Sequence, residues 1–287
     1  MHARERPRGP LAWSVTALAL AALALLIAAP LATVLAEGLA GGAGAFVAAV
    51  VEPDTRSAIL LTLLVVAIVV PFHTIFGVAA AWALTRHDFP GKRAVSTLVD
   101  LPFTVSPVVS GLLFVLLFGA RGLIGPWLRD HDVRILYAVP GVVIATLFVT
   151  LPFVVRELVP TMEAIGREEE EAAASLGASG WQILWRVTLP RVRWALLYGC
   201  VLCAARAAGE FGAVSVVSGH VRGETSTLPL HVEILWGEYR TAAAFAVASL
   251  LATSGLVTLV LKAWLERRAR RARARASSFV SPQGSMS

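Results

Sequence analysis

The sequence predicts an all-α integral membrane protein with six transmembrane helices and both termini in the cytoplasm. Of its 287 residues, 57% are hydrophobic and 15% are charged, whereas soluble domains average about 25% charged residues. The mean hydropathy of +0.73 agrees with a membrane protein. A helix needs roughly 20 mostly apolar residues to cross a bilayer, and backbone groups in lipid must pair internally. Apolar runs that are too long for barrel strands therefore indicate helices.

Five runs without Asp, Glu, Lys or Arg reach that length. They are residues 9–36, 57–85, 101–120, 135–155 and 241–261. A sixth run extends from residue 194 to about 217, although Arg206 and Glu210 interrupt it. The first run has a basic start, so a cleaved signal peptide is an alternative. The apolar core of a signal peptide is only about 7–15 residues long, which favours a span.

The distribution of basic residues predicts the orientation. Eighteen of the 25 Lys and Arg residues lie on the side that holds the two termini, six lie on the other side, and one lies in the sixth run. The positive-inside rule then places residues 1–10 and 266–287 in the cytoplasm, with the transmembrane domain at 11–265. We expect the basic tail at 266–287 to be disordered. Its arginine cluster favours contact with anionic lipid headgroups over nucleic acid.

Three residues within the apolar runs have side chains that could take part in chemistry. A buried His in a span is a functional candidate, but for His73, close to Pro71, we favour a packed and hydrogen-bonded side chain. Cys200 and Cys203 have a spacing that would suggest a metal or redox site in a soluble protein. No second Cys or His pair lies beside them in the sequence. We therefore expect unreactive buried thiols and no metal site.

The segment at about 161–192 is the longest inner stretch apart from the termini. Four acids, Glu168 to Glu171, precede three alanines. This order indicates a helix, because acids suit the positive end of the helix dipole and alanine has the highest helix propensity. Gly177 and Gly180 are possible helix ends, and Pro190 marks the next membrane entry. On these residues alone, a solvated connector and a helix docked in a partner's groove are equally good interpretations.

The spacing within this segment resembles the EAA motif of ABC importer permeases. The matching residues are Glu171, Ala172 and Ala173, then Gly177 after three residues, and Val187, Thr188, Leu189 and Pro190 after nine more. The family usually has Ile at the position of Val187. The resemblance implies a type I ABC importer permease fold. It also implies that Glu171, Ala172, Ala173 and Gly177 belong to a coupling helix on a nucleotide-binding subunit, with Leu189 and Pro190 closing the motif.

A second group of residues is predicted to line or shape a translocation path. It comprises Arg206, Gly209, Glu210 and Gly212. Charges in a span mostly face a helix-bundle interior or a wet cavity. Arg206 and Glu210 are four residues apart, so on one helix they share a face and can pair. The glycines permit close helix approach or local bending. A path-lining role and a purely structural role for the charged pair are equally compatible with the sequence.

Residues 209–223 resemble the sulfate/thiosulfate permease subunits of the CysW type. Residues 100–111 and 228–235 do so as well, and the similarity extends from about 57 to 265. The resemblance implies ATP-driven anion import across a bacterial inner membrane. Its implied partners are a second homologous permease subunit, two ATP-binding subunits and a periplasmic sulfate/thiosulfate-binding protein. A molybdate or tungstate permease is the alternative.

Enzyme classes are disfavoured by the motifs that the chain lacks. The sequence has no Gly-x-x-x-x-Gly-Lys-[Ser/Thr] nucleotide-binding motif. It also lacks the His-Glu-x-x-His and Gly-x-Ser-x-Gly motifs of hydrolytic enzymes. We therefore expect a non-catalytic subunit that binds no cofactor itself, with ATP and Mg on the partner ATPase. A passive anion channel would not need the coupling segment.

Overall fold

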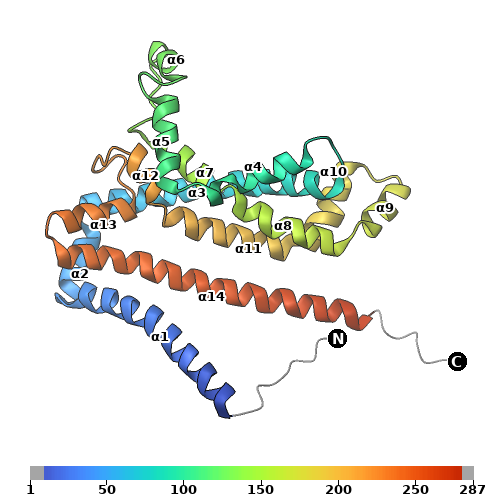
Figure 1. The fold of residues 1–287 in the computed structure, drawn as a ribbon, viewed down its shortest axis with the longest axis horizontal. Coiled ribbons are helices and arrows are strands. Elements are labelled where there is room, and N and C mark those ends of the chain that lie inside the picture. The colour runs from blue at the N-terminus through green and yellow to red at the C-terminus, as the bar shows by residue number, and fades with distance from the viewer. Residues whose placement is uncertain (1–9, 280–287) are drawn as a thin grey trace.

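The computed structural model describes residues 10–279, and every regular element in that range is helical. The helices are α1 (Pro10–Leu39), α2 (Gly42–Val51), α3 (Pro53–Arg86), α4 (Lys92–Thr104), α5 (Pro107–Phe118), α6 (Gly125–Asp130), α7 (Val139–Thr150), α8 (Pro152–Ile165), α9 (Glu168–Ser175), α10 (Gly180–Ile183), the π-helix η1 (Leu184–Thr188), α11 (Leu189–Ala208), α12 (Gly212–Val217), α13 (Leu228–Gly237) and α14 (Thr241–Phe279). Figure 1 shows their arrangement.

Among the described residues, five helical stretches are long and apolar enough to cross a membrane. They are Ala12–Leu39, Pro53–Arg86, Val139–Ile165, Gly180–Ala208 and Thr241–Leu265. The α4 and α5 helices qualify together as a sixth span, bent by 109° at a short break. The prediction of a helical multi-pass membrane chain is thus confirmed.

Two of the predicted spans differ from single straight helices. The run at 101–120 breaks after Thr104, where Ser106 has a ψ of 135° and Pro107 opens α5. Proline disfavours the helical conformation in the residue before it and supplies no backbone donor, which explains the break. The run at 194–217 is also wrong as one helix. Its span ends at Ala208, and α12 is a separate short helix.

The core lies where α8 packs between α3 and α11. Two glycines bring these helices close together. A Cβ at Gly77 would lie 2.5 Å from Cγ1 of Val154, and one at Gly199 would lie 3.2 Å from the Val154 Cα. Small residues at such crossings let helix backbones approach within a membrane protein. The three spans therefore form one tightly packed unit.

The polar residues of this core have structural surroundings. His73 is fully buried, and its Nε2 lies 2.9 Å from the Thr150 hydroxyl. That hydroxyl donates to the carbonyl of Thr146, so the imidazole Nε2–H donates to Thr150. Cys203 is fully buried as well. The interpretation of His73 as a packed and hydrogen-bonded side chain is confirmed.

The last helix is longer than the sequence suggests. It runs from the end of the molecule that holds α13 toward the end that holds α9 and α10 (Figure 1). It continues to Phe279, whereas the sequence predicts disorder from residue 266. Alanine and arginine have high helix propensity, so the basic tail can extend the helix of the span. Residues 1–9, most of the predicted basic N-terminus, and 280–287 lie outside the described range.

Candidate functional site

The α9 helix and the turn after it carry the residues of the predicted coupling segment. All four acids, Glu168 to Glu171, lie in the first turn of α9, where the helix dipole favours negative charge. Gly177 follows the helix with a φ of +86°. The backbone N–H of Ala178 donates to the Ala173 carbonyl, which is the Schellman pattern of helix termination. The left-handed backbone of this turn therefore favours glycine at position 177.

A capping box begins the return toward the membrane. The Ser179 hydroxyl accepts from the Gln182 N–H at 3.4 Å, and the Gln182 side chain accepts from the Ser179 N–H at 2.9 Å. Such reciprocal bonds satisfy free donors at a helix start. From there α10, η1 and α11 run on as a single candidate span. The coupling segment is thus continuous with a transmembrane helix.

The predicted coupling residues divide between an exposed turn and the protein body. Glu171, Ala172 and Gly177 are exposed, whereas Ala173 is half-buried. Leu189 packs against the core, and Pro190 is exposed in the first turn of α11. Three residues of the first part of the motif, Glu171, Ala172 and Gly177, are therefore exposed. The closing residues, Leu189 and Pro190, form the start of α11.

Large apolar side chains in and after this turn are exposed. Leu176 is 90% exposed, Trp181 68% and Trp185 53%. The two indole rings meet edge to face with centroids 5.5 Å apart. Exposed aromatic and aliphatic side chains beside a polar rim mark interaction surfaces in proteins. We name Glu171, Gly177, Leu176, Trp181 and Trp185 together the coupling surface.

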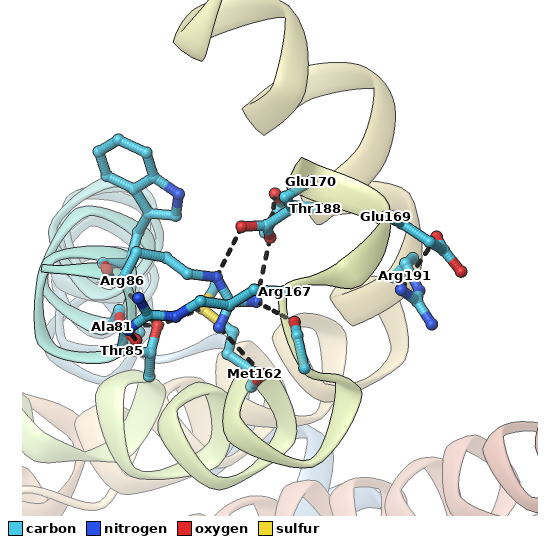
Figure 2. Close-up of polar contacts among 11 residues, drawn as sticks. Ala81, Thr85, Arg86, Met162, Arg167, Glu169, Glu170, Thr188 and Arg191 are labelled. Atoms are coloured by element: carbon cyan, nitrogen blue, oxygen red, sulfur yellow. Dashed lines mark hydrogen bonds and ion pairs between the residues drawn. The ribbon is translucent and has the colours of Figure 1, made fainter. Parts of the chain in front are cut away.

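The residues that hold α9 in place lie partly outside the motif and were not predicted from the sequence. Arg86, the last residue of α3, donates from Nε to Oε2 of Glu170 at 2.7 Å and from Nη2 to Oε1 at 3.0 Å. It also donates to the carbonyls of Met162 at 3.2 Å and Gly166 at 2.9 Å, at the end of α8. Figure 2 shows Arg86 reaching across to the Glu170 carboxylate. The Thr188 hydroxyl of η1 donates to the same carboxylate at 2.8 Å.

Two further polar contacts strengthen this junction. Arg167 donates from Nη2 to the Thr85 carbonyl at 2.5 Å. Arg191 at the start of α11 forms an ion pair of 2.9 Å with Glu169. The sequence offers one signal for such contacts. Successive residues on an α-helix point about 100° apart, so four consecutive acids cannot all face the same way.

The second predicted group lies at the end of α11. Arg206 and Glu210 do pair, with Nη1 and Oε2 2.5 Å apart, but the assumption of a shared helix face is wrong. The helix ends at Ala208, so Glu210 lies in the break before α12. Its buried carboxylate also accepts from the N–H of Ala213 at 2.9 Å. Glu210 thereby joins the end of α11 to the start of α12.

Glycines allow α12 to cross α5 closely at this break. A Cβ on Gly212 would lie 2.9 Å from the Pro107 Cβ, and one on Gly111 would lie 2.8 Å from the Ala213 carbonyl oxygen. At Gly209 the nearest atom would be 3.6 Å away, an ordinary contact. The close approach expected for Gly212 is confirmed, while Gly209 lies at the bend that ends α11 and lines a cavity of about 160 Å³.

Comparisons with known proteins agree with this architecture. The family model for the binding-protein-dependent transport system inner membrane component matches residues 73–271. The chain is 52% identical over 252 residues to the sulfate transport system permease protein CysW of Synechocystis sp., covering 88% of this chain and 91% of the relative. It is 37% identical over 210 residues to the Escherichia coli permease protein CysT, covering 73% and 76%.

A solved structure supports the fold independently of close sequence similarity. A chain of a bacterial alginate ABC transporter, crystallised with an alginate-bound periplasmic protein, superposes with a TM-score of 0.72. The match covers 91% of this chain and 95% of that chain at 19% identity. The type I ABC importer permease fold predicted from the motif is therefore confirmed.

Proposed function

Because the chain belongs to the family of inner membrane components of binding-protein-dependent transport systems, we propose that it is a permease subunit of an ATP-driven sulfate importer. The observation that carries this proposal is that the chain is 52% identical to a sulfate permease over 88% of its own length and 91% of the relative's length. Thiosulfate, a second tetrahedral sulfur oxyanion, is proposed as an additional substrate. The membrane is the inner membrane of a bacterium, with both termini in the cytoplasm.

The proposed complex has four kinds of subunit. Relatives named CysW and CysT are separate proteins, and this chain is similar to both. This supports a partnership with a second, homologous permease. Two ATPase subunits and a periplasmic sulfate-binding protein complete the importer. The ATPases bind ATP and Mg, since this chain lacks the motif whose backbone cradles nucleotide phosphates.

Coupling is proposed to occur at the coupling surface. Its exposed tryptophans and Leu176 would fill an apolar groove on the ATPase, and Glu171 would add charge recognition at the rim. The surface is continuous through α10 and η1 with α11. A displacement imposed on it by ATPase closure would therefore reach the break at Glu210, where α11 meets α12. Alternating access of the anion path would follow from that movement.

The test is ATP hydrolysis in proteoliposomes that contain this chain, a CysT-type permease and the ATPase. Sulfate-loaded and molybdate-loaded binding proteins are compared in the lumen. Stimulation by the sulfate-loaded protein is expected. Stimulation by the molybdate-loaded protein alone would refute the substrate, and no stimulation in an assembled complex would refute coupling.

A further inference from the structure

We propose that Arg86 and Glu170 form a positioning clamp that ties the coupling surface to the membrane-spanning body. The inference rests on the proposed function, since it concerns how ATPase movement is passed on. It assigns a role to two residues outside the family motif. The clamp consists of the Arg86 guanidinium, the Glu170 carboxylate and the Thr188 hydroxyl.

The α9 helix depends on polar contacts for its position. Within the described structure none of its residues is buried, so apolar packing gives it little support. Its polar links to the body are the Glu170 contacts, the Glu169–Arg191 ion pair and the bond from Arg167, the N-cap residue of α9, to the Thr85 carbonyl. The second pair is more exposed, at 58% for Glu169 and 35% for Arg191. Exposed pairs contribute little to stability, so of the two ion pairs the one at Glu170 holds α9 more strongly.

The Arg86 side chain is built into this junction. It is only 7% exposed, and the Glu170 side chain is 14% exposed. Its donors bind Glu170 in a bidentate fork and also reach two carbonyls at the end of α8. A planar guanidinium makes such paired contacts, whereas a lysine ammonium cannot reproduce them. One side chain thus holds α3, α8 and α9 together.

Glu170 extends the junction to a third span. Its Oε1 accepts both from Arg86 and from the Thr188 hydroxyl, and Thr188 lies in η1 just before α11. The π-helical turn is a local departure from α-helical winding, and such turns occur frequently at functional sites. A movement of α9 therefore acts on α3 and α8 through Arg86 and on α11 through Thr188.

The adjacent acid, Glu171, points away from the membrane-spanning body. Glu171 is exposed, and its carboxylate has no hydrogen bond or ion pair with any described residue. Glu170 faces the body and Glu171 faces outward, a difference that the step of about 100° between consecutive helical positions allows. Within the acidic run, Glu170 therefore attaches α9 to the rest of the chain, and Glu171 is available for contact with a partner.

The test measures sulfate transported per ATP hydrolysed by the reconstituted complex. The variants are Glu170→Gln, Arg86→Lys and Thr188→Val, and the matched control is the exposed Glu168→Gln on the same helix turn. We expect each clamp variant to lower this ratio by at least about fivefold, the low end of coupling effects, through ATP hydrolysis that is not linked to transport. The control should keep the wild-type ratio.

Several outcomes separate this inference from the proposed function. A wild-type complex that does not respond to sulfate-loaded binding protein refutes the function itself. A responsive wild type with unchanged ratios in Glu170→Gln and Thr188→Val refutes the clamp. A purely structural role would reduce the amount of assembled complex at an unchanged ratio, which also overturns the inference. Thr188→Val keeps the Arg86–Glu170 pair, so it remains informative if Arg86→Lys fails to insert.

Discussion

Replacing Gly177 by alanine should weaken ATPase coupling through the backbone of one turn. The residue has a φ of +86°, and apart from its two chain neighbours no described residue has an atom within 4 Å of a Cβ built at this position. A clash with residues elsewhere in the chain is therefore not the cause. A residue with a Cβ pays roughly 1–2 kcal/mol for the left-handed conformation, which lowers the equilibrium constant for closing the turn about 5- to 30-fold.

Two matched variants isolate this backbone effect. Asn enters the left-handed region several-fold more often than most residues, so Gly177→Asn should retain more coupling than Gly177→Ala although its side chain is larger. Gly180 has no positive φ and equally open surroundings, so Gly180→Ala should behave as wild type. The assay is ATP hydrolysis stimulated by sulfate-loaded binding protein, normalised to assembled complex.

The order of ATPase activity among these variants tests whether backbone conformation is the cause. If Gly177 matters only because a small residue lets the ATPase approach, Asn should be worse than Ala. That order would refute the argument from backbone conformation. Equal and normal activity of both variants would show that the Schellman turn does not set the position of the coupling surface.

Further predictions concern the break between α11 and α12 and the ion pair between Arg240 and Glu52. Arg206→Ala should lower stability by up to about 3 kcal/mol because it leaves the buried Glu210 carboxylate unpaired, and adding Glu210→Gln should restore part of the unfolding temperature. Gly212→Ala should cost about 1–3 kcal/mol by overpacking against the proline that opens α5, measured by thermal unfolding in detergent. The Arg240 guanidinium lowers the pKa of Glu52 from 4.5, so their pair stabilises the fold above that pH and is lost as pH falls through the lower folded-state pKa. Arg240→Gln should flatten that acid-side decrease in unfolding temperature, and an unchanged pH profile would contradict it.

The sequence predicts the spans well because burial in lipid demands long apolar runs. The runs at 57–85 and 241–261 lie inside α3 and α14. The two failures occur where an apolar run contains a break. Membrane helices tolerate proline when neighbours satisfy the freed backbone groups, so Pro107 alone does not distinguish a kink from the 109° bend. Beside this bend α12 packs closely against α5 at Gly111 and Gly212.

The candidate site was predictable only in its local features. The Glu171 to Gly177 spacing is a local pattern, and the structure has a helix and a terminating turn at those positions. The clamp is not local, because Arg86 and Glu170 are 84 residues apart in the sequence. Which acid of the run meets Arg86 depends on how α8 ends at Gly166, whose φ of +77° is a conformation that favours glycine. No pattern of residue types carries that information.

The division between Glu170 and Glu171 gives the acidic run a physical rationale. A coupling helix must be held firmly by its own chain and still present charge to a partner. A single carboxylate cannot do both, since the Glu170 oxygens already accept from Arg86 and Thr188. Adjacent helical positions point in different directions, so two neighbouring acids meet both demands. On this reasoning Glu171→Gln should weaken binding of the ATPase without changing sulfate transported per ATP. Glu170→Gln should do the reverse, and identical defects in the two variants would contradict the division.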